Sequence, residues 1–234
     1  MSSKDNQTAA VRPHDSRRLL RGESVSDYSI RDALIRHAEF VSGTALDLGC
    51  GSRPYESFFN GRVSRWVAAD YPASGHPPAP HVDVFADAMQ LPLAAESFDT
   101  VLCTQVLEHV PEPMDVLRES WRVLRPGGHL VLTAPQYNAL HGEPQDFYRY
   151  TRYGLEHLAR RVGFDVRLIE PIGGLISLFT FFTTIHCAPL RMWPLNGLWQ
   201  WTGWKLDSLF SRPKDCMGYL LVARRTGQAN GNGR

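Results

Sequence analysis

Short apolar runs alternate along this chain with segments whose apolar residues recur at helical spacing. The runs predict strands over 44–48, 67–70, 82–86, 100–104, 129–133, 165–170 and 218–223. The helical spacing predicts helices over 28–40, 113–124 and 151–162. In the last of these, Thr151 is the expected N-cap and Gly163 the expected C-terminal stop. Pro126-Gly127-Gly128 is expected to end the second helix before the fifth strand.

This alternation of strands and helices is typical of a mostly parallel sheet that helices cover on both faces. Ligands of such sheets bind beyond the carboxyl ends of the strands. The residues that directly follow each predicted strand are therefore the first candidates for a functional site.

The division of the chain follows from changes in composition. We expect a flexible, polar arm over residues 1–22 and one folded domain over 23–225. Within the domain, an apolar, cap-like insertion covers about 171–212. A Gly/Asn-rich tail over 226–234 is expected to be disordered.

Charge and cysteine content exclude several classes of function. The 234 residues carry a formal net charge of +1, so nucleic acid is not an expected partner. The four cysteines form no Cys-x-x-Cys pair and no metal-finger spacing. Reduced, buried thiols and a polar N-terminus without an apolar signal core favour a cytoplasmic protein.

The first predicted strand runs into Asp47-Leu48-Gly49-Cys50-Gly51. Two glycines let the backbone turn tightly and approach a ligand closely. A dinucleotide-binding loop would need Gly or Ala where this chain has Pro54, which argues against a nicotinamide-dependent oxidoreductase. A carboxylate at Asp47 is better suited to a ligand that carries an ammonium or sulfonium charge.

The second and third predicted strands also end at acidic residues. Asp70 follows the glycines by about twenty positions, where a carboxylate can accept hydrogen bonds from both ribose hydroxyls. An Asp at a strand end is also a common turn former, which is the structural alternative. Asp87 is placed to accept from an adenine amino group, and Met89 to pack on the ring.

In combination, these motifs resemble the class I S-adenosylmethionine-dependent methyltransferases, in the branch that acts on small molecules. The resemblance covers about residues 46–164 and comprises D-L-G-C-G, the strand-end Asp, D-A-x-x-L-P, F-D-x-V, L-E-H-V and L-R-P-G-G, in the family's order. Many members carry a third glycine where this chain has Arg53. The resemblance implies a Rossmann-like fold, an α/β architecture whose seven-stranded sheet has an antiparallel last strand.

The resemblance also implies the roles of individual residues. The implied cofactor contacts are Asp47, Gly49, Cys50 and Gly51 for the methionine part, Asp70 for the ribose, Tyr71, Asp87 and Ala88 for the adenine, and the Gln105 carbonyl for the ammonium group. His109 of L-E-H-V lies near the site, either as a packing residue or as a catalytic one.

The loop after the fifth predicted strand, residues 141–150, is the candidate acceptor site because it concentrates titratable and aromatic side chains. His141 is the favoured general base, with Glu143 and Asp146 orienting it or the substrate. The structural alternative is a lid in which Asp146 pairs with Arg149. The same three residues, His141, Glu143 and Asp146, could also ligate a divalent ion, although no metal is part of the favoured interpretation.

The segment 171–190 contains no Asp, Glu, Lys or Arg. Its glycines, hydroxylated residues and Pro189 argue against a transmembrane span. An apolar cap over a substrate pocket or a homodimer contact is favoured. An interfacial patch on a membrane surface is the remaining interpretation.

The sequence therefore predicts methyl transfer from S-adenosylmethionine to a small-molecule acceptor, with a hydroxyl of a natural product, sugar or lipid-linked intermediate as the favoured group. The alternatives are N- or C-methylation of a small molecule, and a non-catalytic S-adenosylmethionine-binding regulatory domain.

Overall fold

The computed structural model describes residues 15–72, 81–187, 195–210 and 214–227. Its sheet has seven strands in the order β3-β2-β1-β4-β5-β7-β6. Their bounds are β1 Gly43–Leu48, β2 Val63–Asp70, β3 Val84–Phe85, β4 Phe98–Thr104, β5 Leu124–Pro135, β6 Phe164–Ile172 and β7 Gly218–Arg225. β7 is antiparallel to both of its neighbours, whereas the pairs from β3 to β5 are parallel. The expected methyltransferase-like architecture is confirmed.

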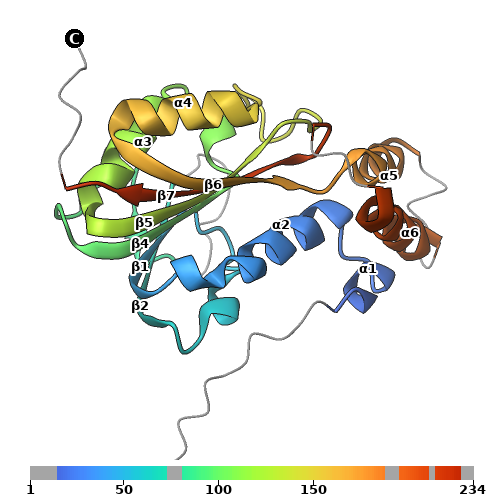
Figure 1. Ribbon diagram of the computed structural model, residues 1–234, viewed down its shortest axis with the longest axis horizontal. Coiled ribbons are helices and arrows are strands. Elements are labelled where there is room, and N and C mark those ends of the chain that lie inside the picture. The colour runs from blue at the N-terminus through green and yellow to red at the C-terminus, as the bar shows by residue number, and fades with distance from the viewer. Residues whose placement is uncertain (1–14, 73–80, 188–194, 211–213, 228–234) are drawn as a thin grey trace, which may run out of the picture.

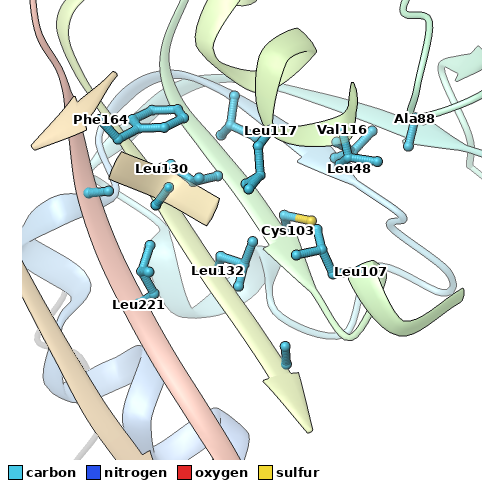
Figure 2. Packing of buried hydrophobic residues seen from close by; sticks show 14 of the residues in the cluster. Leu48, Ala88, Cys103, Leu107, Val116, Leu117, Leu130, Leu132, Phe164 and Leu221 are labelled. Carbon is cyan, nitrogen blue, oxygen red and sulfur yellow. The ribbon is translucent and has the colours of Figure 1, made fainter. Parts of the chain in front are cut away.

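Helices cover both faces of the sheet (Figure 1). α3 (Pro113–Val123) and α4 (Arg152–Val162) lie on one face, and α2 (Val25–Arg36) lies on the other. Figure 2 shows the larger core, where side chains of the sheet such as Leu130 and Leu132 pack with Leu117 of α3. A second core joins Ile30 and Leu34 of α2 to the opposite face of the same strands.

The helix boundaries follow the sequence in part. The helix predicted over 28–40 is α2 over Val25–Arg36, which begins three residues earlier and ends at Arg36, and a separate 3-10 turn covers Ala38–Phe40. Thr151 accepts a hydrogen bond from the Gly154 N–H, and Gly163 ends α4 in the left-handed conformation, as expected. Pro126-Gly127-Gly128 does not separate α3 from the fifth strand, because β5 begins directly at Leu124. The Leu124 C-cap is already extended, so the chain passes from helix to strand without a separate turn.

The apolar insertion forms two helices, α5 (Leu175–His186) and α6 (Leu195–Phe210), beside the carboxyl end of β6. Both carboxylate oxygens of Asp207 in α6 accept hydrogen bonds at the start of α5, from the N–H groups of Gly174, Ile176 and Ser177. These three N–H groups would otherwise have no partner at the helix N-terminus. α5 and α6 are therefore fixed to each other as one unit.

The expected N-terminal arm differs from the structure over its last residues. Arg17–Leu20 forms a short helix, α1, beside α6, with the Leu19 side chain buried. A Cβ atom on Gly197 of α6 would lie 2.8 Å from the Leu19 carbonyl oxygen, so the two helices approach closely. Apolar contact thus holds this part of the arm on the domain. Residues 1–14 and 228–234 lie outside the described residues.

Candidate functional site at the carboxyl ends of the strands

The loop after β1 is shaped by two glycines with positive φ. Gly49 has φ +73°, and a Cβ atom there would lie 2.2 Å from Val106 Cγ2, so no larger residue fits. Gly51 has φ +48°, and a Cβ atom there would meet no atom within 4 Å. The space beside Gly51 is therefore open to a ligand, which can approach the backbone closely.

Arg53 stands where the family resemblance implied a third glycine, and its backbone conformation fits that expectation. Its φ is +58°, the left-handed region that glycine adopts most easily. The guanidinium group donates to the His81 carbonyl oxygen at 3.0 Å and pairs with Glu56 at 3.1 Å. These contacts offset the strain, so the loop keeps a glycine-like turn without the glycine.

Asp47, near the end of β1, is the most unusual group of this site. Its side chain is buried. Neither carboxylate oxygen has a hydrogen bond of ordinary geometry among the described residues, although the Trp66 indole N–H lies close enough to lower the pKa of Asp47. Burial raises the pKa of Asp47 to about 7, although the charge of Arg53 opposes the shift. A buried carboxylate without a partner is unfavourable. A cationic ligand group would supply the missing charge.

Asp70, at the end of β2, faces the glycine loop. Its Oδ2 atom accepts from the Gly51 N–H at 2.9 Å, and its Oδ1 atom from the Tyr71 N–H at 2.8 Å. A carboxylate has about four acceptor positions, so capacity remains for hydroxyl groups of a ligand. The Cys50 thiol lies 3.9 Å from Asp70 Oδ2, and burial raises its pKa to about 12. Tyr71 is largely exposed beside it.

The turn after β3 and the end of β4 carry the remaining candidate residues at the carboxyl edge of the sheet. Asp87 Oδ1 accepts from the Met89 N–H at 2.8 Å, and Ala88 is buried between them. Gln105 has φ +54°, which is strained for a residue with a side chain. Its amide Nε2 donates to Thr133 Oγ1 at 3.1 Å, so the side chain is tied to β5.

A hollow adjoins Gln105 and reaches the apolar insertion. The hollow is small and its lining is part polar and part apolar; it comprises Ser26, Ile30, Gln105, Pro135, Tyr137, Asn138, Ile172, Phe181, Met217 and Gly218. Phe181 belongs to α5, and Ile30 belongs to α2. Phe181 of the insertion therefore takes part in the wall of this hollow.

In the loop 141–150, Asp146 is held chiefly by Arg149, and its Oδ2 atom also lies 3.7 Å from the His141 Nδ1 atom. The Arg149 guanidinium donates to both Asp146 oxygens, at 2.6 and 2.9 Å, and also to the Ala139 carbonyl oxygen. This pairing holds the pKa of Asp146 well below its usual range. Asp146 Oδ2 also accepts from the His141 backbone N–H at 3.0 Å. Asp146 thus fixes the backbone of the loop, as in the structural alternative, and Glu143 is exposed to solvent.

The structure brings His141 and His109 together. Their rings meet edge to face with centroids 4.7 Å apart. The His141 Nδ1 atom lies 3.0 Å from the Ala139 carbonyl oxygen, and the His109 Nδ1 atom lies 2.5 Å from the Gln145 carbonyl oxygen. Asn138 lines the hollow, and the carbonyl oxygen of the next residue, Ala139, binds the His141 ring. The two imidazoles therefore form a polar centre close to the hollow.

Glu108 belongs to the same centre and was not singled out from the sequence. It is fully buried, and His109 Nε2 lies 4.0 Å from its Oε1 atom. The ligand-capable atoms of Glu108, His109 and His141 all lie within 4.8 Å of one another. The signal available in the sequence was a charged residue within the apolar run Val106–Val110. The sequence suggested His141, Glu143 and Asp146 as a possible ion site. Among the described residues, the structure instead brings His141 together with Glu108 and His109.

The outer face of the insertion exposes large apolar side chains. They are Leu175 and Phe179 of α5, and Leu195, Leu198, Leu206, Leu209 and Phe210 of α6. Exposed apolar clusters of this kind mark contact with another molecule or surface. Among the described residues, no helix combines the length and apolar character needed to cross a membrane.

Comparison with known proteins agrees with this geometry. A family model described as a methyltransferase domain matches residues 46–132, which carry most of the row of strand-end residues. A protein of Mycobacterium ulcerans, described as an uncharacterized methyltransferase, is 30% identical, and the match covers 62% of this chain and 68% of that protein.

Two further similarities are more limited. The 27-O-demethylrifamycin SV methyltransferase of Amycolatopsis mediterranei is 50% identical over 48 residues, which are 20% of this chain and 18% of that protein. The solved structure of a putative methyltransferase from Bacillus halodurans has a TM-score of 0.57 at 18% identity, covering 85% of this chain and 99% of that one. At this identity the structural similarity shows the fold alone.

Proposed function

Since this chain belongs to the class I S-adenosylmethionine-dependent methyltransferase family, we propose that it methylates a hydroxyl group of an apolar small molecule. S-adenosylmethionine supplies a methyl group that is already activated on a sulfonium. The protein's own contribution is therefore to align the acceptor, exclude water and take up the proton that a hydroxyl must lose.

The acceptor class is inferred from the hollow beside Gln105. Ile30, Ile172, Phe181 and Met217 in its wall favour an apolar acceptor, and Gln105 and Asn138 offer a few polar contacts. The relative whose name specifies a 27-O-demethylated acceptor supports oxygen as the methylated atom, within the short stretch that matches.

The observation that carries the proposal is the tautomer of His141. A carbonyl oxygen only accepts hydrogen bonds, so the contact with Ala139 assigns the proton of a neutral His141 to Nδ1. The Nε2 atom is then left with its lone pair and can accept the proton of a hydroxyl. His109 packs against this ring and holds it in place. Asp146 keeps the loop in position through the His141 backbone N–H.

The cofactor contacts are part of the same proposal. Asp47 balances the ammonium group with its buried carboxylate, and Gly49, Cys50 and Gly51 pass close to the methionine part. The other contacts are Asp70 to the ribose hydroxyls, Tyr71, Asp87 and Ala88 around the adenine, and the carbonyl of Gln105 to the ammonium group. The open space at Gly51 and the buried Asp47 carboxylate support this assignment.

Methyl transfer from labelled S-adenosylmethionine to a panel of apolar alcohols and phenols tests the acceptor class. Matched amines and carbon acceptors on the same ring systems serve as controls. We expect label on the hydroxyl compounds. Label only on nitrogen or carbon would favour N- or C-methylation, and cofactor binding with no transfer to any acceptor would favour a regulatory domain.

Asp70→Ala should weaken binding of S-adenosylmethionine by about 1–3 kcal/mol, because the hydrogen bonds to the ribose hydroxyls are lost. Isothermal titration calorimetry measures the change, and NAD should not bind the wild-type protein in the same experiment. If the variant binds S-adenosylmethionine as tightly as the wild type, Asp70 does not contact the cofactor. Asp115→Asn on α3 is a control at a partly exposed carboxylate.

A further inference from the structure

The Glu108 carboxylate is buried without a hydrogen-bond partner. It is 0% exposed, and neither of its side-chain oxygens has a hydrogen bond within the part of the chain that the structure describes. Burial raises the pKa of Glu108 to about 7, and the charge of Arg149 opposes that shift. Buried carboxylates are normally paired or bind a metal ion. His109 Nε2, at 4.0 Å from Glu108 Oε1, is too far away to donate a hydrogen bond, so a cation between the two groups would satisfy the carboxylate.

Two histidines lie beside this carboxylate, and His109 Nε2 is 4.0 Å from Glu108 Oε1. His109 Nδ1 donates to the Gln145 carbonyl oxygen at 2.5 Å, as His141 Nδ1 does to the Ala139 carbonyl oxygen. Both neutral rings consequently keep the lone pair on Nε2. Metal-binding histidines characteristically donate their second ring N–H to a backbone carbonyl in this way, which fixes tautomer and ring orientation before the ion binds.

The three groups are close enough for one ion. Their ligand-capable atoms lie within 4.8 Å of one another. Bond lengths of about 2.0–2.2 Å to zinc would bring such atoms to about 3.3–3.5 Å, which small side-chain rotations achieve. The His109 and His141 side chains are 28% and 38% exposed, so both can rotate and an ion can enter from their side.

The backbone holds the loop against Glu108. The Phe147 N–H donates to the Glu108 carbonyl oxygen at 2.8 Å, which pins the loop over the helical turn that carries Glu108 and His109. Gly142 has φ +67°, and a Cβ atom there would lie 3.1 Å from His109 Cε1. The loop can approach His109 closely because this residue is glycine.

We propose that Glu108, His109 and His141 bind one divalent transition-metal ion of the zinc type. Two imidazole nitrogens and one carboxylate favour such an ion over Mg²⁺ or Ca²⁺, which prefer oxygen ligands. Three protein ligands leave a coordination position open. The role of the ion rests on the proposed function, in which His141 Nε2 itself takes up the proton. With an ion bound, that lone pair would hold the metal instead, and an acceptor hydroxyl at the open position would release its proton to water more readily.

Direct metal binding tests the site without any acceptor. Protein treated with EDTA and dialysed is titrated with Co²⁺, followed by its visible absorption, and with Zn²⁺, followed by calorimetry. We expect one ion per chain and a loss of affinity of at least about 100-fold in His141→Ala and Glu108→Gln. His157→Ala, an exposed histidine on α4, should bind as wild type does.

Because Glu108 is buried, its replacement could disturb folding. Circular dichroism and S-adenosylmethionine binding therefore verify that Glu108→Gln is folded. His141→Ala, in a more exposed loop, provides the second variant. Absence of saturable binding, or equal binding by the folded variants and the wild type, would overturn the metal site. Transfer to hydroxyl acceptors that persists in excess EDTA would leave the proposed function standing without the metal. Metal binding without transfer to hydroxyl acceptors would instead refute the proposed function alone.

Discussion

Asp47→Asn is expected to weaken S-adenosylmethionine binding by about 10- to 100-fold at pH 8, through loss of a buried charge that faces the ammonium group. The wild-type affinity should itself rise between pH 6 and pH 8, because the pKa of Asp47 in the free protein is about 7 and only the ionised carboxylate attracts a cation. Asp47→Asn has no carboxylate at this position, so its affinity should not show the rise between pH 6 and pH 8 that comes from Asp47. Calorimetry at pH 6, 7 and 8 measures both effects.

The same substitution should stabilise the protein without its cofactor. The folded-state pKa of Asp47 lies above the unfolded value of about 4, so its contribution to stability is largest below pH 4 and is lost as the pH rises through 7. The difference of about three units between the folded and unfolded pKa of Asp47 limits its effect on the free energy of unfolding to about 4 kcal/mol. We expect Asp47→Asn to raise the free energy of unfolding by about 1–3 kcal/mol at pH 8. Urea unfolding at pH 5 and pH 8 measures it.

Asp165→Asn, at a partly exposed carboxylate on β6, is the matched control for both measurements and should change neither. A variant that binds the cofactor as tightly as wild type at pH 8, or one that is no more stable than wild type at that pH, would contradict the role assigned to Asp47.

His141→Ala is expected to lower the rate of methyl transfer to a hydroxyl acceptor by about 10²–10⁴-fold, which is the usual cost of losing a positioned proton acceptor. The affinity for S-adenosylmethionine should stay nearly unchanged, because His141 lies on the loop after β5 and not in the row of cofactor contacts. Single-turnover kinetics with labelled cofactor separates the transfer step from binding.

His157→Ala removes an exposed imidazole on α4 and should leave the transfer rate unchanged. If His141→Ala keeps most of the wild-type rate, proton transfer must occur elsewhere, and His109, whose ring contacts His141, becomes the residue to replace next.

The row of strand-end residues that we propose to bind the cofactor could be located from the sequence because its signals are local. Asp47, Gly49 and Gly51 fall within five positions of one strand end, and parallel strands bring their carboxyl ends to the same edge. Asp70 and Gln105 could therefore be placed beside them from the order of strands alone. What this reasoning did not reveal is that the Asp47 carboxylate is buried beside the Trp66 indole of β2, because burial depends on how the neighbouring strand and loop pack around it.

The acceptor end was less predictable because its contacts join distant parts of the chain. His141, Glu143 and Asp146 are close in sequence, yet Asp146 binds Arg149 and Glu143 is exposed. His109 meets His141 across 32 positions of sequence, where hydrogen bonds such as that from the Phe147 N–H to the Glu108 carbonyl oxygen hold the loop over the turn. No periodicity or motif encodes such a backbone contact.

The sequence by itself determined the alternating fold, the family and the row of strand-end residues, because strand periodicity and glycine turns act over a few neighbouring positions. Only the tertiary structure decided which titratable groups meet. It placed Glu108 beside the two imidazoles, brought α1 onto α6, and turned Phe181 of α5 toward the hollow. These outcomes depend on packing and on hydrogen bonds between segments that are far apart in the chain, whose partners are chosen only when the whole domain has folded.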